Sequence, residues 1–268
     1  MWISRRLEEA RRAFRRRDRE GAAAAHDPGR MAASAEERHG GAASQYVGDM
    51  VYGGLDGILT SFAVVSGVAG AALGTRVLLV LGLSNLFADG FAMGIGALLS
   101  LKSEKEYYDR ELRRETWEME HYPDGERREL LEIYRRKGYS EEDAQGIVGI
   151  QTRDKGRWVE AMMVEELGLI RDERRPLWAG LATFLSFAAA GALPLLFYLA
   201  VPLLGLRGSV AFPLCVGLTA VGLFALGAAK VRVTGMNPLR SGLEMLAVGG
   251  LAAGVAYGVG ALLGGSGG

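Results

Sequence analysis

Five long apolar segments dominate the pattern of hydrophobic and polar positions along the 268-residue chain. Each segment holds about the 20 residues that a helix needs to cross a hydrocarbon core roughly 30 Å thick. The pattern therefore predicts five transmembrane helices, over residues 47–70, 77–100, 177–200, 209–230 and 241–263.

The charged residues are segregated from these apolar segments. Of the 31 basic and 31 acidic residues, 53 fall within residues 1–45 and 101–176. A charge near the centre of a bilayer costs roughly 2.5 to 3.5 kcal/mol on insertion scales, so charges collect outside the spans. The distribution predicts four parts, which are a flexible Arg-rich tail (1–45), two spans (46–100), a charged block (101–176) and three further spans (177–268).

The charged block has the pattern of a helical domain rather than a loop. It contains 20 acidic and 16 basic residues. One helix is expected to continue from the second span over about 101–121, and a second to cover 125–137. A third is expected to begin after Ser140 as its N-cap and to reach about residue 172. The predicted fold class is therefore an all-α integral membrane protein of five transmembrane helices, with a three-helix domain inserted between the second and third.

Basic residues near the ends of the spans predict the orientation in the membrane. If the N-terminus is cytoplasmic, the two short outer loops keep only Arg76 and Arg207, and the other basic segments lie inside. This arrangement obeys the positive-inside rule, and the opposite one violates it. The N-terminus and residues 101–176 are therefore expected in the cytoplasm, and the C-terminus outside.

Composition narrows the chemistry. A single cysteine, Cys215, excludes a disulfide within one chain and a thiolate metal site. With only three histidines, a metal site built from several histidines is not expected. The Arg-rich N-terminus lacks the apolar core of a signal peptide. The net charge is zero, and no nucleic-acid partner is expected.

Asp56 is an acidic residue inside the first predicted span. Gly53, Gly54 and Gly57 flank it, and Asp49 lies two helical turns earlier on the same face. An ionisable residue within a span marks an ion or proton path by default. The alternative interpretation is a carboxylate that only accepts hydrogen bonds from Ser or Thr of another helix.

Met93 occupies a similar setting in the second span. Asp89 lies one turn before it, and glycines surround it. A thioether is a soft ligand that favours transition metals over Mg²⁺ or Ca²⁺. A lone methionine in a span more often serves packing, and that alternative stands beside the metal-ligand interpretation.

The charged block carries further candidate metal ligands on each predicted helix. Glu111, Glu115 and Glu118 share one helix face, Glu126 and Glu129 share the next, and Met162, Met163 and Glu166 lie within one turn of the third. Carboxylates with thioethers are the mixture expected for Fe²⁺ or Mn²⁺ rather than zinc. The alternatives are a solvated charged face for the glutamates and an apolar core stripe for the methionines.

A di-iron oxidase is a weaker interpretation of the same residues. Helix-bundle di-iron enzymes need two Glu-x-x-His motifs and two further glutamates. The charged block offers one such motif, Glu118 to His121.

These constellations, in this order, resemble the vacuolar iron transporter family over residues 46–263. The motifs that carry the resemblance are GGLDGxxTxFAVVxG in the first span, ADGxxMGxG followed by KSExEY in the second, and WxxxMMxEExGL near residue 160. The resemblance implies five spans, a homodimer, and exchange of Fe²⁺ and often Mn²⁺ for protons. By resemblance Asp56 and Met93 line the path through the membrane. The cytoplasmic metal-binding site would consist of Glu115, Glu118, Glu126, Glu129, Met162, Met163 and Glu166. Ala97, Leu98 and Gln45 stand where family members often carry acidic or aromatic residues.

The favoured functional prediction is a proton-coupled transporter that exports Fe²⁺, Mn²⁺ or both from the cytosol, and not an enzyme. Its transport pathway would include Asp49, Asp56, Asp89 and Met93, and it would hold no prosthetic group. The alternative is a membrane-anchored metal-binding or sensing protein that moves no ion. The host membrane is expected to be the plasma membrane in a bacterium and a vacuolar-type membrane in a eukaryote.

Overall fold

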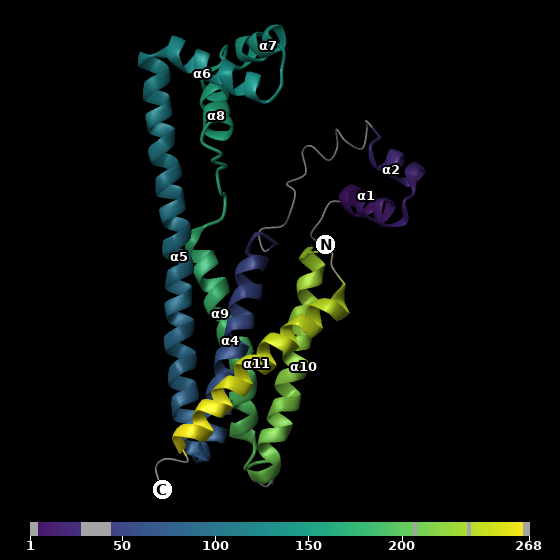
Figure 1. Cartoon of the computed structure of the whole chain (residues 1–268), viewed down its shortest axis with the longest axis vertical. Coiled ribbons are helices and arrows are strands. Elements are labelled where there is room, and N and C mark those ends of the chain that lie inside the picture. The colour runs from purple at the N-terminus through teal and green to yellow at the C-terminus, as the bar shows by residue number, and fades with distance from the viewer. Residues whose placement is uncertain (1–4, 28–43, 206–207, 235–236, 265–268) are drawn as a thin grey trace. The chain divides into compact units, whose positions relative to one another are not determined.

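The computed structural model of the chain describes residues 5–27, 44–205, 208–234 and 237–264, and these residues form helices and connections without any strand. The chain divides into two compact units, Met1–Ala97 with Leu177–Gly268, and Leu98–Pro176. Figure 1 shows the helices in chain order: α1 (Arg5–Arg16), α2 (Arg19–Ala25), the short η1 (Ser44–Tyr46), α4 (Val47–Gly70), α5 (Thr75–His121), α6 (Pro123–Arg136), α7 (Glu141–Gln151), α8 (Lys155–Glu165), α9 (Pro176–Ala200), α10 (Gly208–Thr234) and α11 (Pro238–Gly264).

Five of the described helices, α4, α5, α9, α10 and α11, are long and apolar enough to cross a membrane. The prediction of five spans is confirmed, and the chain is an integral membrane protein. Of the N-terminal segment predicted as a flexible tail, Arg5–Arg16 and Arg19–Ala25 are helical. Residues 28–43 of that segment lie outside the described part.

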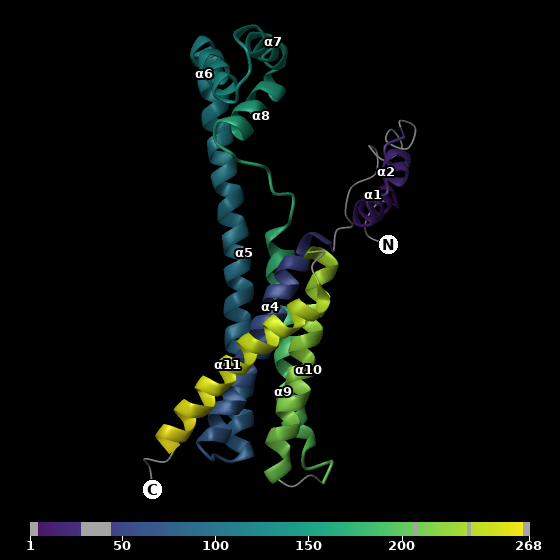
Figure 2. The same cartoon turned by 45° about the vertical axis from the view of Figure 1, so that its right-hand side comes forward.

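Glycines let α4 pack directly against the backbone of two other helices. A Cβ atom at Gly57 would overlap the carbonyl group of Phe187 in α9, and a Cβ at Gly260 in α11 would overlap the carbonyl oxygen of Gly67 in α4. Figure 2 shows α11 running obliquely across α4 and α10, and both pairs are in contact. Small residues allow this close approach, which places α4 at the centre of the bundle.

The repeat of Gly250, Gly254 and Gly258 predicts a close neighbouring helix. Within the protomer no described residue takes that place, because a Cβ at any of the three would meet nothing within 4 Å. The spacing identifies a helix face of small residues, but it does not identify which face the fold buries. Gly260 and Gly249 lie on the buried face instead.

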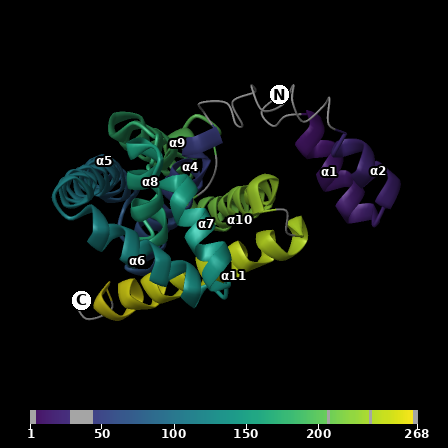
Figure 3. The same ribbon diagram turned by 90° about the horizontal axis from the view of Figure 1, so that it is seen from above.

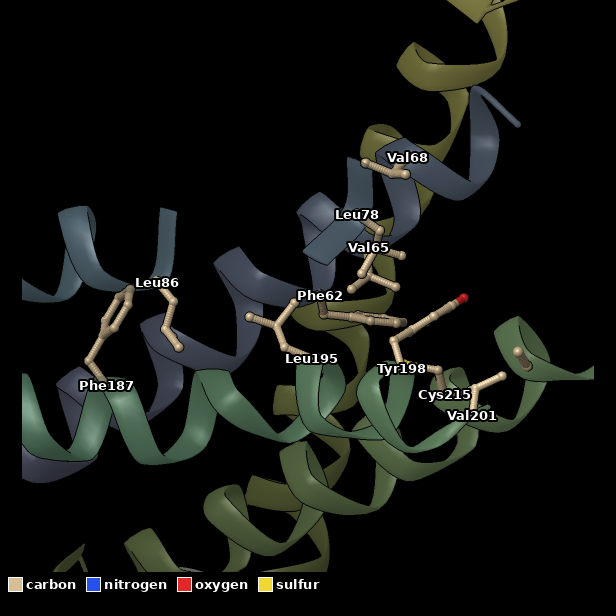
Figure 4. Packing of buried hydrophobic residues seen from close by; sticks show 11 residues of the cluster. Phe62, Val65, Val68, Leu78, Leu86, Phe187, Leu195, Tyr198, Val201 and Cys215 are labelled. Atoms are coloured by element: carbon tan, nitrogen blue, oxygen red, sulfur yellow. The ribbon is translucent and has the colours of Figure 1, made fainter. Parts of the chain in front are cut away.

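The apolar core of the membrane-spanning unit lies between α4, α5, α9 and α10. Figure 4 shows Phe62 of α4 lying against Leu195 and Tyr198 of α9, with Leu86 of α5 beside Phe187. All five side chains are buried. This core fixes the register of α4 against α5, the two helices that carry the acidic residues predicted for the ion path.

The unit Leu98–Pro176 contains the last part of α5 together with α6, α7 and α8. Figure 3 shows α6, α7 and α8 gathered together, and they are in mutual contact. Their shared core includes Leu130, Ala144, Trp158, Met162 and Met163, each buried. Helix α5 runs through from its membrane-spanning part without a break, as the sequence predicts.

The predicted single helix from Ser140 to about residue 172 is wrong. Ser140 is indeed an N-cap, and its side chain accepts a hydrogen bond from the backbone N–H of Asp143 over 3.1 Å. The helix ends at Gln151, and Asp154 caps a new helix by accepting from the N–H of Arg157. Residues 166–175 are not helical, and Gly168 has a positive φ of 65°. The described part of this unit therefore contains four helical segments instead of three.

A methyl group at Gly260 tests the close packing of α11 on α4. We expect Gly260→Ala to destabilise the protein by about 1–3 kcal/mol, because the added Cβ forces two helix backbones apart. Gly217→Ala in α10 is the matched control, since its Cβ would meet nothing within 4 Å and alanine favours a helix. Thermal melting in detergent compares the two, and equal melting temperatures would contradict the packing argument.

Candidate metal site

Three acidic side chains from three different segments converge in the unit Leu98–Pro176. One carboxylate oxygen each from Glu115 of α5, Glu126 of α6 and Glu166 after α8 lies within 4.8 Å of the other two. Glu115 is 1% exposed and Glu126 is 7% exposed, and Glu166 is half-buried. We name these three residues the glutamate cluster.

Local structure explains how each segment presents its acid. Glu126 lies in the first turn of α6, which begins with Pro123, and a helix N-terminus favours negative charge. Glu166 follows the last turn of α8, where its backbone N–H donates to the carbonyl oxygen of Met162 over 3.0 Å. The methionines Met162 and Met163, 1% and 0% exposed, fix the end of α8 in the apolar core.

The buried carboxylate oxygens of the glutamate cluster lack hydrogen-bond donors. Both oxygens of Glu115 and one of Glu126 are buried without a hydrogen bond from any described residue. Arg114 Nη2 lies 2.5 Å from Glu115 Oε1, but this ion pair does not have hydrogen-bond geometry. Buried polar atoms without partners are costly, so the site is suited to a cation that would accept these lone pairs.

Burial and mutual repulsion raise the pKa values of all three acids. The pKa of Glu115 is raised to about 7, first by burial and then by the charge of Glu166. Burial and the charge of Glu118 also raise the pKa of Glu126 to about 7. The pKa of Glu166 is raised by burial and by Glu129. Near neutral pH the cluster therefore exchanges protons, and a metal that needs ionised ligands competes with them.

Glu118 and Glu129 lie at the edge of the cluster. Glu118 accepts a hydrogen bond of 2.5 Å from Arg114 Nη1, and its side chain is 31% exposed. Glu129 is exposed and lines a groove with Glu166. The charges of both residues act on Glu126 and Glu166, so they add to the negative potential of the site.

The two methionines occupy the packing role that the amphipathic pattern offers as an alternative. Both are buried among the apolar side chains of α6, α7 and α8. Their role as metal ligands stays a prediction.

The acidic residues predicted for the membrane path lie on α4 and α5. Asp49, in the first turn of α4, and Asp56 are both half-buried. The charge of Asp89 on α5 acts on Asp56, so the two carboxylates lie close enough to repel. Met93, one turn beyond Asp89, packs against the apolar core. The roles of these four residues in transport stay predictions.

The sequence analysis misses one functional candidate, Arg114. Glu111, a candidate metal ligand in that analysis, is 8% exposed and accepts hydrogen bonds from Arg110 and Arg114. Arg114 is not considered there at all, although it contacts Glu111, Glu115 and Glu118. Their spacing of three and four residues along one helix is the signal that would identify the group.

Carboxylate oxygens are hard ligands, and three of them at one point suit Mn²⁺, Fe²⁺ or Mg²⁺ rather than a soft metal. With Glu118 and Glu129 nearby, the donor set is acidic enough to concentrate a divalent cation from solution. The chemistry of the arrangement suits the binding of a divalent cation.

Comparison with known proteins gives a consistent picture. A model of the VIT family matches residues 47–261. A vacuolar iron transporter of Toxoplasma gondii is 42% identical over 266 residues, covering 96% of this chain and 88% of that protein. A vacuolar iron transporter of Plasmodium falciparum is 36% identical over 220 residues, with 80% and 81% covered. Vacuolar iron transporter 1 of Arabidopsis thaliana is 32% identical over 216 residues, with 80% and 85% covered. The family resemblance inferred from the motifs is confirmed.

The raised pKa values predict that metal binding at the glutamate cluster releases protons. We expect Mn²⁺ to bind at least about tenfold more weakly at pH 6 than at pH 8, because protons occupy the glutamates at the lower pH. Calorimetry of the whole protein in detergent, repeated in buffers of different ionisation enthalpy, measures both affinity and proton release.

Glu115→Gln serves as the test variant for this proton release, and Glu142→Gln as the control. Glu115→Gln removes a buried acid and should lower both affinity and the number of released protons. Glu142 is exposed in the first turn of α7, so its variant should behave as the wild type does. Mn²⁺ binding that does not change with pH would contradict the competition.

Proposed function

The chain belongs to the VIT family, and from this premise we propose that it is a transporter of divalent iron rather than an enzyme. The relatives named above support the proposal, since they are named iron transporters and the match covers most of each chain. The five apolar helices provide the membrane-spanning part that transport requires.

The observation that carries the proposal is the glutamate cluster. Its buried oxygens lack donors, and its acids have raised pKa values, so a metal ion and protons are interchangeable occupants. A resident structural metal would need no such exchange. We propose that the cluster captures Fe²⁺ from the cytosol, with Glu118, Glu129, Met162 and Met163 completing the ligand set.

We further propose that the captured ion passes the membrane beside Asp56 and Met93. Asp49 would receive the ion near the start of α4. Asp89 and Asp56 would then both contribute negative charge that attracts the ion. Glycines beside these residues, Gly57 on α4 and Gly94 on α5, allow close packing against α9. This packing holds the two helices at a fixed spacing, within which a partly dehydrated ion can meet oxygen and sulfur ligands together.

Proton coupling follows from the same chemistry. A carboxylate binds a metal only when it is deprotonated, so Asp56 would alternate between a proton and an ion. Protons entering from the far side would displace the metal, and the metal would displace protons on the cytosolic side. Export from the cytosol, driven by a proton gradient, is the resulting cycle. Mn²⁺ accepts the same oxygen ligands as Fe²⁺ and is proposed as a second substrate.

The orientation that suits this cycle is the one that the positive-inside rule predicts. The N-terminus and residues 101–176 would face the cytosol, and the C-terminus would lie on the opposite side. A vacuolar-type membrane is proposed as the site of action, because the relatives are vacuolar transporters.

A homodimer is proposed as the transporting assembly. In the most apolar 18-residue segment of α11, only 11% is buried within the protomer, compared with 50% in the corresponding segment of α4. The open glycine face at Gly250 and Gly254 would let a helix of a second copy approach closely. Two protomers would also supply more helices to enclose an ion path than five alone.

A membrane-anchored metal sensor is the second candidate, and the glutamate cluster is compatible with it. Asp56 distinguishes the two functions, because a protein that only anchors a metal-binding unit has no need of a half-buried acid within its first span.

Transport in liposomes tests the proposed mechanism. We expect Asp56→Asn to reduce Fe²⁺ uptake driven by a pH gradient at least about tenfold, because the amide cannot exchange a proton for the metal. Collapsing the gradient should have the same effect on the wild-type protein. Glu142→Gln is the control, and its uptake should match the wild type. Undiminished uptake by Asp56→Asn would favour the sensor.

The mass of the protein in native detergent complexes tests the assembly. We expect twice the mass of the 28.7 kDa chain after correction for detergent. Gly254→Leu should shift the population toward the monomer, because a large side chain on the open face blocks close approach of a second helix. A monomeric mass for the wild type would rule out the dimer.

A further inference from the structure

Arg114 occupies an unusual position beside the glutamate cluster. Its Nε donates to Glu111 Oε2 over 2.9 Å, while Nη1 and Nη2 lie 2.5 Å from Glu118 Oε2 and Glu115 Oε1. One guanidinium therefore contacts three glutamates on successive turns of the same helix. Its planar group presents five N–H donors in a fixed geometry, which suits such multiple contacts.

Glu111 holds Arg114 in this position. The Glu111 carboxylate is 8% exposed and also accepts two hydrogen bonds from Arg110, over 2.9 and 2.7 Å. It is absent from the proposed ligand set, so it is free to keep Arg114 when other partners change. Arg114 is thus attached at one end, and its other two nitrogens reach two of the proposed metal ligands.

The charge of Arg114 acts on every member of the glutamate cluster, Glu115, Glu126 and Glu166. Two basic residues of α6 lie nearby. Arg127 stacks over the Trp158 ring at 4.9 Å and pairs with Asp124, while Arg128 lines the groove beside Glu129 and Glu166. In the metal-free protein Arg114 therefore neutralises part of the negative charge of the glutamate cluster.

A divalent ion and the guanidinium compete for the same oxygens. An ion bound by Glu115 and Glu118 takes the lone pairs that face Arg114, and two cations at this separation repel each other. We propose that Arg114 is a tethered counter-ion that neutralises the metal-free site and competes with the arriving metal. This inference rests on the proposed function.

This competition has a purpose in transport. A site that captures an ion for transport must also release it, and buried carboxylates without a competing cation would hold the ion longer. Arginine stays charged at every physiological pH, so its competition is constant, whereas protons compete only as pH falls. Arg114 thus sets the basal affinity of the site, and it also stabilises the empty cluster.

The test measures Mn²⁺ affinity of the whole protein in detergent at pH 8 by calorimetry. We expect Arg114→Gln to bind Mn²⁺ about tenfold or more tightly than the wild type, because the repelling charge is gone. Arg113→Gln is the matched control, since Arg113 lies beside Arg114 on the same helix, both side chains are exposed, and its loss changes the net charge equally. Its affinity should stay within about twofold of the wild type.

Two further measurements separate competition from general damage. Without metal, Arg114→Gln should melt at a lower temperature than Arg113→Gln, because the empty cluster has lost its counter-ion. Arg114→Lys retains the charge but cannot contact three carboxylates in one plane, so it should tighten Mn²⁺ binding only about threefold. This variant keeps the proposal testable if Arg114→Gln does not fold.

Unchanged or weaker Mn²⁺ binding by the Arg114 variants would overturn the proposal, since Arg114 would then organise the glutamates rather than compete for them. Such a result leaves capture by the cluster intact if the wild type binds Mn²⁺ and Glu166→Gln does not. Failure of the wild type to bind Mn²⁺ at all would instead remove the proposed capture function, and the role of Arg114 with it.

Discussion

The repulsion between carboxylates held out of water is the constraint on which the rest of the unit Leu98–Pro176 depends. Glu115, Glu126 and Glu166 come from three segments, and each would be more stable in water as a separate anion. The apolar core around Met162 and Met163 forces them together, because α8 cannot pack without bringing Glu166 to the cluster. Protons, a guanidinium and a metal ion are the available means of neutralising that charge. The fold therefore favours the binding of positive charge at the cluster, and a proton, a guanidinium or a metal ion can each provide it.

Repulsion between carboxylates also acts in the membrane-spanning unit, where lipid stabilises charge less well than water does. Asp56 lies on the most buried of the five spans and close enough to Asp89 to repel it. Glycine packing makes this arrangement possible, since Gly57 and Gly94 let α9 contact α4 and α5 without intervening side chains. A proton or a cation would relieve this repulsion, and the proposed proton-coupled transport of a metal relies on that relief.

The sequence predicts those features that depend on local pattern. The five spans follow from uniform hydrophobicity, and Ser140 follows from its place before an acidic first turn. The break between α7 and α8 is missed because Asp154, its N-cap, lies among charged residues that are common inside helices. The convergence of Glu126 with Glu166 depends on how α6 packs against α8, which no spacing along the chain encodes. Glycine spacing is limited for a related reason, since it marks a helix face without indicating what covers it.

Arg114 illustrates how burial changes the meaning of a familiar pattern. Opposite charges three and four residues apart on a helix normally form solvent-exposed ion pairs worth well under about 1 kcal/mol, and they are reasonably ignored in a sequence. Here one partner, Glu115, is buried with unsatisfied oxygens, and another, Glu111, is held by a second arginine. The pair is therefore part of a site rather than of a surface. A proton and an arginine then neutralise the cluster in different ways, because the proton responds to pH and the arginine does not. Under the proposed function, an ion entering the cluster would meet one fixed competitor and one that the proton gradient controls.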